Sequence, residues 1–302
     1  MNCKWITIII TAIVVIIGII VVVTCVVKVE SSGNVISLED NAFDDQYVGC
    51  EKTMEMRAKD LLAQERAINS NFSKVWKNAE SKWENMSPKK KRMNMLFEVA
   101  IIAYTMEENK IYPTFNQAVR KCCYSSEDYM NNFHFKALHF YLTRAVQILR
   151  TSCTNVYRGI SVGMHPDGTG EMRFGQFAST SLEEGAARKF INASGTLYKV
   201  YTCEGANIEH LSVFPDEKEV LIPPYEVFSV SRFLDSGGLK NVELHSKRTF
   251  SKFNCAYLRG KKNQNYLVTS GNINSMVLGK VTPRLFVGTQ LLLLRILCLN
   301  SS

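Results

Sequence analysis

Two patterns of hydrophobic positions divide the central part of the chain. From about residue 47 to residue 150, apolar residues recur at steps of three and four, the spacing that places them on one face of an α-helix. Pro88 and Pro113 interrupt this pattern, and the run Lys89-Lys90-Lys91-Arg92 is most simply an exposed turn. The sequence therefore predicts a mostly helical half over residues 47–150. The positions with this spacing are Leu61, Leu62, Ile68, Leu96, Val99, Ala100, Ala103, Tyr104, Leu138, Tyr141, Leu142, Ala145 and Leu149.

After Arg150 the pattern changes to short β-like runs separated by Gly, Pro and Ser. A block of helices followed by a block of strands, here residues 151–260, is typical of an α+β fold and not of alternating α/β units. No G-x-G-x-x-G motif follows a predicted strand, so a Rossmann-type cofactor site is not expected. The predicted strands are residues 155–160, 196–202, 220–222, 226–232 and 241–244.

The two ends of the chain have the composition of sorting or membrane segments. Residues 5–27 are uncharged and would form about 35 Å of helix, enough to cross a bilayer. Residues 1–30 are therefore a cleaved signal peptide or a retained signal-anchor, and both alternatives export the rest of the chain. Residues 261–302 form a basic tail with an apolar stretch at 285–299, which Arg295 interrupts. This stretch resembles a glycolipid-anchor signal, and the alternative is a frayed or lightly buried tail.

Composition and charge narrow the class of protein. The chain has 302 residues, of which 46% are hydrophobic and 21% charged, so disorder is excluded and a sizeable core is available. The net charge is +8, and from Lys240 onward ten basic residues face the single acid Glu243. That basic stretch could face an anionic membrane or an acidic partner, but a solvated surface is the simpler reading. No nucleic-acid motif accompanies it, so we expect no nucleic-acid partner.

Cysteine usage agrees with export. Three of the nine cysteines, Cys3, Cys25 and Cys298, lie in the end segments, and an even number remains for an oxidising compartment. None of the spacings is that of a zinc site, so no metal is expected. Asn71 and Asn192 begin N-glycosylation sequons that export would make usable. The six remaining cysteines are Cys50, Cys122, Cys123, Cys153, Cys203 and Cys255.

Two motifs in the β-rich half could carry chemistry. Arg158, in the string Tyr-Arg-Gly of a predicted strand, has a planar guanidinium that suits a phosphate or carboxylate, although a strand arginine usually faces outward. The string Gln176-Phe-Ala-Ser-Thr-Ser reads as a strand end feeding a helix cap at Thr180 or Ser181. That reading leaves Gln176 and Ser179 free for another role.

A third motif is a pair of carboxylates, Glu217 and Glu219. In an extended segment, residues two apart point to the same side, so the two carboxylates would lie together while Lys218 points away. Two like charges side by side are unfavourable and call for a cationic substrate or transition state. The alternative for this tripeptide alone is a solvated loop before a strand.

Taken together, the three motifs resemble the R-S-E signature of the arginine-specific mono-ADP-ribosyltransferase family, which includes the exported ecto-enzymes. The matching residues are Arg158, Ser179 and Glu217-x-Glu219, followed by the string Val-Leu-Ile-Pro-Pro. The resemblance spans residues 43–260 and so implies a single catalytic domain, with the helical half packed on a β-sandwich core. It also implies disulfides between Cys50 and Cys255 and between Cys153 and Cys203.

The resemblance implies the reaction and the roles of the residues. NAD⁺ would be cleaved at the nicotinamide–ribose bond and ADP-ribose transferred to arginine, with NADP⁺ use left open. Glu219 would stabilise the ribosyl cation, Arg158 would bind the dinucleotide, and Ser179 would hold the ribose and orient Glu219. Glu217 would accept the proton of the acceptor arginine, whose guanidinium is otherwise a poor nucleophile. By position, Tyr104, Gln176 and Ser212 are expected to be further NAD contacts.

Two other functions stay open at this stage. One is an NAD⁺ glycohydrolase that uses the same pocket with water as acceptor. The other is an inactive surface-recognition protein on the same scaffold. Partners would be NAD⁺ and acceptor proteins with an exposed arginine outside the cytosol. The target protein, the mode of membrane attachment and the state of Cys122 and Cys123 cannot be read from the sequence.

Overall fold

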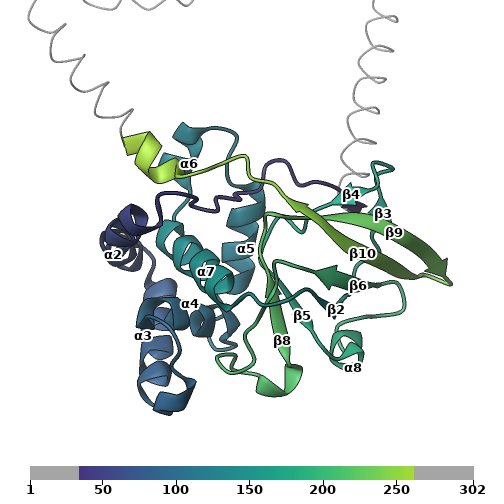
Figure 1. The fold of residues 1–302 in the computed structure, drawn as a ribbon, viewed down its shortest axis with the longest axis horizontal. Helices are drawn as coiled ribbons and strands as arrows, with labels where there is room; N and C mark the ends of the chain where they lie inside the picture. Colours follow the sequence, from purple (N-terminus) through teal and green to yellow (C-terminus); the bar gives the residue numbers. More distant parts are fainter. Residues whose placement is uncertain (1–33, 262–302) are drawn as a thin grey trace, which may run out of the picture. The chain divides into compact units, whose positions relative to one another are not determined.

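The helical half begins at Glu51, a few residues after the predicted start at about residue 47. The computed structural model describes residues 34–261, and the leader expected at residues 1–30 and the tail after residue 261 lie outside them. Figure 1 shows these helices on one side of the domain and the strands on the other. The helices are α2 (Glu51–Ile68), α3 (Ser70–Glu84), α4 (Met95–Thr105), α5 (Tyr112–Lys121), α6 (Ser126–Asn132) and α7 (Lys136–Leu149), with the 3₁₀ turn η1 (Pro88–Lys90) between α3 and α4.

Local chemistry explains where these helices start. The side chains of Asn69, Asn94 and Ser125 accept backbone N–H bonds in the first turns of α3, α4 and α6. Pro113, one of the two predicted breaks, lies in the first turn of α5, where its missing N–H costs nothing. Helix α4 is apolar apart from Glu98 and Thr105 and is buried from Phe97 to Thr105, so it forms the centre of the helical core.

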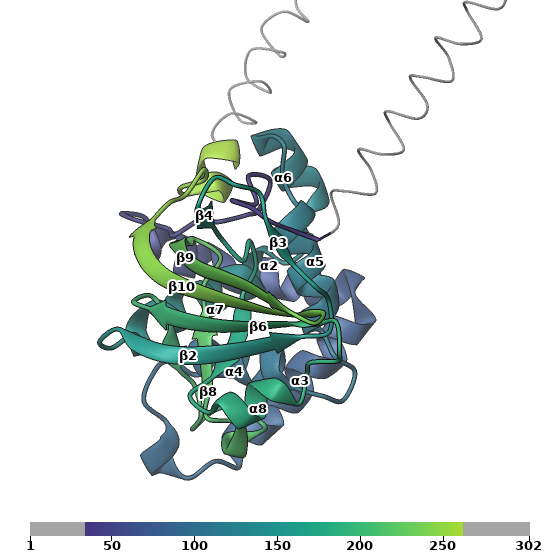
Figure 2. The ribbon, with the colours of Figure 1, turned by 90° about the vertical axis from the view of Figure 1, so that its right-hand side faces the viewer.

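The strands form one hydrogen-bonded sheet of eight strands in the order β4-β9-β10-β6-β2-β5-β8-β7. Only the β10–β6 pair is parallel in this sheet, and the separate pair β1–β3 is also parallel. Figure 2 shows β9, β10, β6 and β2 side by side across the domain. The strands are β1 (Val35–Ile36), β2 (Thr154–Ile160), β3 (His165–Pro166), β4 (Glu171–Met172), β5 (Ala178–Ser181), β6 (Thr196–Thr202), β7 (Ala206–Asn207), β8 (Glu219–Ile222), β9 (Glu226–Ser236) and β10 (Leu239–Thr249).

The α+β division is confirmed, but the strands do not separate into the two sheets of a sandwich. Instead β2 and β5 join through a single residue pair, Tyr157 and Ser181, so five strands and three strands meet at a narrow junction. The short helix α8 (Glu184–Arg188) contacts both β2 and β5 at this junction. The residues that the sequence singled out as chemical lie next to it.

The domain has two hydrophobic cores. One joins the helices to the sheet and includes Phe177, just before β5, and Leu221 of β8, and the other lies on the opposite face of the sheet and includes Val220 and Ile222. The alternation along β8 follows the two-residue period of a strand, so this strand is buried on both faces. Residues at its start are therefore held firmly.

Two buried carboxylates near the start of the domain bind its end. Asp44 forms an ion pair with Arg173 (2.6 Å), with both side chains fully buried, and accepts the backbone N–H groups of Lys252 and Phe253. Arg173 also donates to the backbone carbonyls of Leu38, Glu39 and Phe250. The interaction therefore joins the first, middle and last segments of the domain.

Asp45 and a disulfide reinforce this closure. Asp45 accepts the backbone N–H groups of Cys255 and Ala256, and Cys50 is bonded to Cys255. A second disulfide joins Cys153 to Cys203, at the ends of the paired strands β2 and β6. These are the two pairings that the resemblance implies. The sulfur atoms of the adjacent Cys122 and Cys123 also lie in contact. Within residues 34–261, no helix has the length and apolar composition needed to span a membrane.

The Asp44–Arg173 pair generates a prediction about stability. Arg173→Met leaves the Asp44 carboxylate buried without its counter-ion, so we expect a loss of about 3–5 kcal/mol of unfolding free energy. Urea denaturation followed by circular dichroism measures this loss. The control is Arg188→Gln, which breaks the exposed pair with Glu184 and should cost less than about 1 kcal/mol. Equal losses in the two variants would contradict the central role of the buried pair.

Candidate active site

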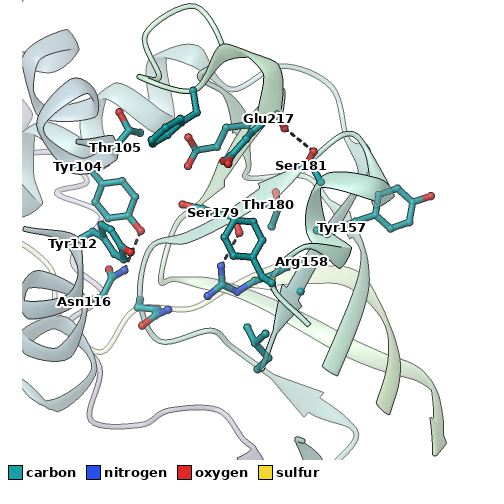
Figure 3. Close-up of a pocket in the computed structure, with 18 of the residues that line it drawn as sticks. Tyr104, Thr105, Tyr112, Asn116, Tyr157, Arg158, Ser179, Thr180, Ser181 and Glu217 are labelled. Carbon is teal, nitrogen blue, oxygen red and sulfur yellow. Dashed lines mark hydrogen bonds between the residues drawn. The ribbon is translucent and has the colours of Figure 1, made fainter. Parts of the chain in front are cut away.

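A cleft of about 810 Å³ lies between the helical half and the sheet. Its walls come from α4, α5, β2, β5, α8 and the turn before β8. Figure 3 shows Tyr104 and Asn116 on the helical side, with Arg158 and Ser179 on the strand side facing them. A cleft of this size, lined by convergent polar groups, is suited to a substrate as large as a dinucleotide.

Arg158 lies in β2 and faces into this cleft. Its Nη1 donates to the backbone carbonyl of Ser179 (2.7 Å), and its guanidinium lies over the ring of Phe174 (5.9 Å from the centroid). Burial lowers the pKa of Arg158, but the side chain keeps its charge because a guanidinium ordinarily loses its proton only above about pH 12. Gly159 follows it because a Cβ there would lie 1.9 Å from the backbone oxygen of Ala187 in α8. The sequence Arg-Gly thus lets α8 pack close beside a charged side chain.

Strand β5 carries the hydroxyl side chains of Ser179, Thr180 and Ser181, and these have different partners. Thr180 donates to the carbonyl of Val220 (2.6 Å), and Ser181 donates to the carbonyl of Glu217 (2.6 Å). The Ser181 hydroxyl also accepts the N–H of Glu183, and α8 has no side-chain cap. The expectation of a helix cap at Thr180 or Ser181 was therefore wrong, because both hydroxyls bind the strand and turn that carry the carboxylates.

Glu219 begins β8 and is only 5% exposed. Its Oε2 accepts the hydroxyl of Ser212 (2.9 Å). Burial raises the pKa of Glu219, hydrogen bonds from Ser179 and Ser212 oppose the rise, and the charge of Glu217 adds to it. Two serine hydroxyls thus favour the ionised form of a carboxylate whose burial favours the neutral form.

Glu217 reaches the same cleft by a different backbone path from the one expected. It ends the 3₁₀ turn η2 (Pro215–Glu217), and Lys218 has the left-handed conformation with φ of +44°, so the segment is not extended. Both carboxylates nevertheless line the cleft, while Lys218 turns outward to pair with Glu183 (2.6 Å). Burial raises the pKa of Glu217, the nearby Lys189 lowers it and Glu107 raises it further.

The three residues predicted as further NAD contacts lie differently relative to the cleft. Tyr104 lines the cleft, but its hydroxyl already donates to the carbonyl of Phe177 and accepts from Asn116, and burial raises its pKa to about 12. Gln176 lines the cleft with an Oε1 that has no partner among the described residues. Ser212 does not line the cleft and lies behind Glu219.

Sequence reasoning missed one wall of the cleft. Tyr112, Asn116 and Arg120 occur at four-residue steps on α5, so all three point to the same side and line the cleft. Asn116 is 6% exposed, and its Oδ1 has no partner among residues 34–261. The four-residue spacing of polar side chains was a usable signal. No comparable signal marked the exposed aromatic residues Phe190 and Phe214, which also line the cleft.

The arrangement can bind an anion and stabilise a cation within one cleft. Arg158 and Arg120 supply positive charge from the two walls, and Glu217 and Glu219 supply negative charge at one end of the cleft. Among residues 34–261, no group of three or more His, Cys, Asp or Glu side chains could hold a metal ion. A substrate with phosphates and a centre that becomes positive during the reaction fits these charges.

Comparison with known proteins agrees with this chemistry. The sequence profile of the NAD:arginine ADP-ribosyltransferase family (ART) matches residues 36–252. The chain is 43% identical over 256 residues to human ecto-ADP-ribosyltransferase 5, covering 80% of this chain and 86% of that protein. It is 40% identical over 224 residues to T-cell ecto-ADP-ribosyltransferase 2 of Rattus norvegicus, covering 72% and 78%.

Solved structures show the same similarity in three dimensions. The crystal structure of the eucaryotic mono-ADP-ribosyltransferase ART2.2 superposes with a TM-score of 0.66 at 38% identity, covering 74% of this chain and 99% of that one. A variant of ART2.2 in complex with NAD superposes with a TM-score of 0.65, also at 38% identity and with the same coverage.

The contacts of Ser181 generate a prediction for the turn that carries Glu217. Ser181→Ala removes a hydroxyl that serves the Glu217 carbonyl and the Glu183 amide, so we expect a loss of about 1 kcal/mol in unfolding free energy. We also expect faster amide hydrogen exchange over residues 215–219, measured by mass spectrometry. The control is Ser231→Ala, whose hydroxyl makes an exposed bond to Glu243. Unchanged exchange in the turn would show that Ser181 does not hold it.

Proposed function

Because the chain belongs to the NAD:arginine ADP-ribosyltransferase family, we propose that Arg158, Ser179 and Glu219 cleave NAD⁺ in this cleft. The protein is a mono-ADP-ribosyltransferase, which transfers ADP-ribose from NAD⁺ to arginine side chains and releases nicotinamide. The observation that carries the residue assignment is the meeting of Arg158 with the carboxylates of Glu217 and Glu219 in one cleft.

The cleft binds NAD⁺ through charges and through two amide oxygens that have no hydrogen-bond partner among residues 34–261. Arg158 and Arg120 attract the pyrophosphate, because guanidinium groups form charge-assisted hydrogen bonds with phosphate oxygens. The free carbonyl oxygens of Asn116 and Gln176 accept hydrogen bonds from hydroxyl or amino groups of the substrate. A buried oxygen without a partner is unfavourable in the free protein, so binding relieves that penalty. Tyr104 contributes mainly by positioning Asn116, since its hydroxyl is already bonded.

Glu219 stabilises the bond-breaking step. Loss of nicotinamide leaves an oxocarbenium-like cation on the ribose, comparable to the transition state of glycoside hydrolysis. A buried carboxylate interacts with that cation more strongly than an exposed one, because little water screens it. Hydrogen bonds from the hydroxyls of Ser179 and Ser212 favour the ionised form of the carboxylate and orient it. Ser212 is thus a positioning residue that acts through Glu219.

Glu217 selects arginine as the acceptor. A protonated guanidinium is a poor nucleophile, and a carboxylate beside it both attracts it and accepts its proton during attack. Burial raises the pKa of Glu217, which makes it a better base than an exposed glutamate. Without this group the same cleft would still cleave NAD⁺ and pass ADP-ribose to water. An NAD⁺ glycohydrolase is therefore the second candidate function, and the intact carboxylate pair favours transfer over it.

The protein acts outside the cytosol, at the cell surface or beyond it. Its long-range disulfides suit an oxidising compartment, and its relatives are named ecto-enzymes. Its acceptors are proteins with an exposed arginine in that space. Attachment through residues 1–30 or through a lipid at the C-terminal segment stays a prediction, as does the use of NADP⁺.

Replacing Glu219 and Glu217 in turn by glutamine tests whether one carboxylate serves NAD⁺ cleavage and the other serves transfer to arginine. Glu219→Gln removes the charge that stabilises the ribosyl cation, so nicotinamide release should fall by about 10²-fold or more. Glu217→Gln should abolish transfer to agmatine while much of the NAD⁺ hydrolysis remains. Labelled NAD⁺ incubated with and without agmatine, with products separated by chromatography, measures both activities.

The matched control is Glu108→Gln, an exposed glutamate near the cleft but outside its lining, which should leave both activities unchanged. Equal loss of transfer and hydrolysis in Glu217→Gln would refute the division of labour. Full activity in Glu219→Gln would refute the whole assignment.

The raised pKa of Glu219 predicts how the rate of NAD⁺ cleavage depends on pH. Burial raises this pKa, so the rate of NAD⁺ cleavage should fall as the pH drops through a midpoint above that of an ordinary glutamate. Ser212→Ala removes a hydrogen bond that favours the ionised form, so the midpoint should move to higher pH. Measurement of kcat/KM against pH tests this, with Ser229→Ala, a half-buried serine of β9 outside the cleft lining, as control. A midpoint that stays in place or moves to lower pH would contradict the role of Ser212.

A further inference from the structure

A basic surface loop between α3 and α4 has no role in the chemistry of the cleft. Its four consecutive cations are Lys89, Lys90, Lys91 and Arg92. The preceding helix α3 adds Lys74, Lys77 and Lys82, all exposed, so seven basic residues face only the acids Glu80 and Glu84 over this stretch. Glu80 is already paired with Arg66. The α3–α4 loop therefore presents a concentrated positive charge.

Three exposed cations of the loop have no ion-pair partner in the part of the chain that the structure describes. Lys89, Lys90 and Arg92 are exposed and take part in none of the ion pairs found among residues 34–261. Lys91 differs, because its Nζ lies 4.0 Å from the centre of the Trp83 ring and donates to the carbonyl of Glu84. One cation thus anchors the loop and three remain available to a partner.

The backbone of this loop is held in a fixed shape by a buried carboxylate. Glu98, which is fully buried, accepts the N–H groups of Arg92 and Met93 and the indole N–H of Trp83. Pro88 opens the 3₁₀ turn η1, in which the N–H of Lys91 binds the carbonyl of Pro88. A carboxylate in the core is costly, and here it shapes a loop of exposed lysines. A loop ordered in advance loses less entropy when it binds a ligand.

We propose that the α3–α4 loop binds a sulfated polysaccharide of the cell surface or matrix. Clustered lysines and arginines attract closely spaced anions, and release of counter-ions from a polyanion favours such binding. The loop exposes no large apolar side chain, since Met86 and Met93 are half-buried, so it lacks the anchor that a membrane-surface segment uses. Helix α3 lies on the side of the helical half away from the strands (Figure 1), and none of the loop residues 85–94 is among those that line the cleft.

Binding to a heparin-derived dodecasaccharide tests this proposal. The variant Lys89→Gln, Lys90→Gln, Arg92→Gln should bind about 10-fold or more weakly than the full-length wild type at about 0.15 M salt. The slope of log affinity against log salt concentration should fall by about 2–3, one for each lost ionic contact. Transfer of ADP-ribose to agmatine should stay at the wild-type rate, which shows that the variant is folded.

A matched variant distinguishes an effect of the loop itself from an effect of the protein's net charge. Lys52→Gln, Arg57→Gln, Lys59→Gln removes the same number of exposed cations from α2 and should leave binding nearly unchanged. An equal loss of polysaccharide affinity in both variants would overturn the proposal, because net charge alone would then explain the binding. Absence of wild-type binding at about 0.15 M salt would overturn it too.

Two further measurements address the alternatives. Vesicles containing phosphatidylserine replace the polysaccharide in one arm, and loop-dependent binding to vesicles alone would overturn the proposal in favour of a membrane. In the other arm, Glu98→Gln keeps every exposed cation but weakens the bonds that order the loop, so polysaccharide affinity should fall while the salt slope is retained. Unchanged affinity in this variant, with its fold verified by agmatine transfer, would contradict the claim that the shape of the loop matters.

Discussion

The ion pair between Asp44 and Arg173 is the constraint on which the rest of the domain depends. It is fully buried, and each partner also binds backbone groups of distant segments. Arg173 lies three residues before Gln176 and six before Ser179, so the segment that enters the cleft starts from a fixed point. Because a buried charge must keep its partner, the first and last segments of the domain cannot separate without exposing it. The geometry of the cleft thus depends on an interaction outside it.

The cleft itself depends on a different principle, which is unequal burial of like charges. Glu219 starts a strand that is buried on both faces and is held by serine hydroxyls, whereas Glu217 is half-buried in an otherwise exposed turn. Two carboxylates of the same type therefore have different surroundings and can take different roles in one reaction. Ser181 connects the two, because its backbone pairs with Glu219 and its side chain holds the carbonyl of Glu217.

Much of the fold and of the candidate site could be predicted from the sequence, and the predictions that were wrong or missing have physical causes. The helical half and strand β6 follow from periodicity, since their buried faces repeat at regular steps. Strands β9 and β10 extend several residues beyond the predicted runs, because their outer ends are solvated and show no apolar alternation. The conformation of Lys218 has no signature in the residue type, so the turn before Glu219 was mistaken for extended chain. The α5 wall was missed because its polar residues resemble an ordinary solvated face.

The turn that ends at Lys218 has a consequence for how such enzymes diversify. The carboxylate of Glu217 reaches the cleft through the shape of a short loop, while that of Glu219 is fixed by the pairing of β8 with β5. A single insertion or deletion between residues 212 and 217 would therefore redirect the first carboxylate and leave the second in register. Under the roles proposed for the two carboxylates, a change in loop length would alter the choice of acceptor and leave the cleavage of the glycosidic bond intact.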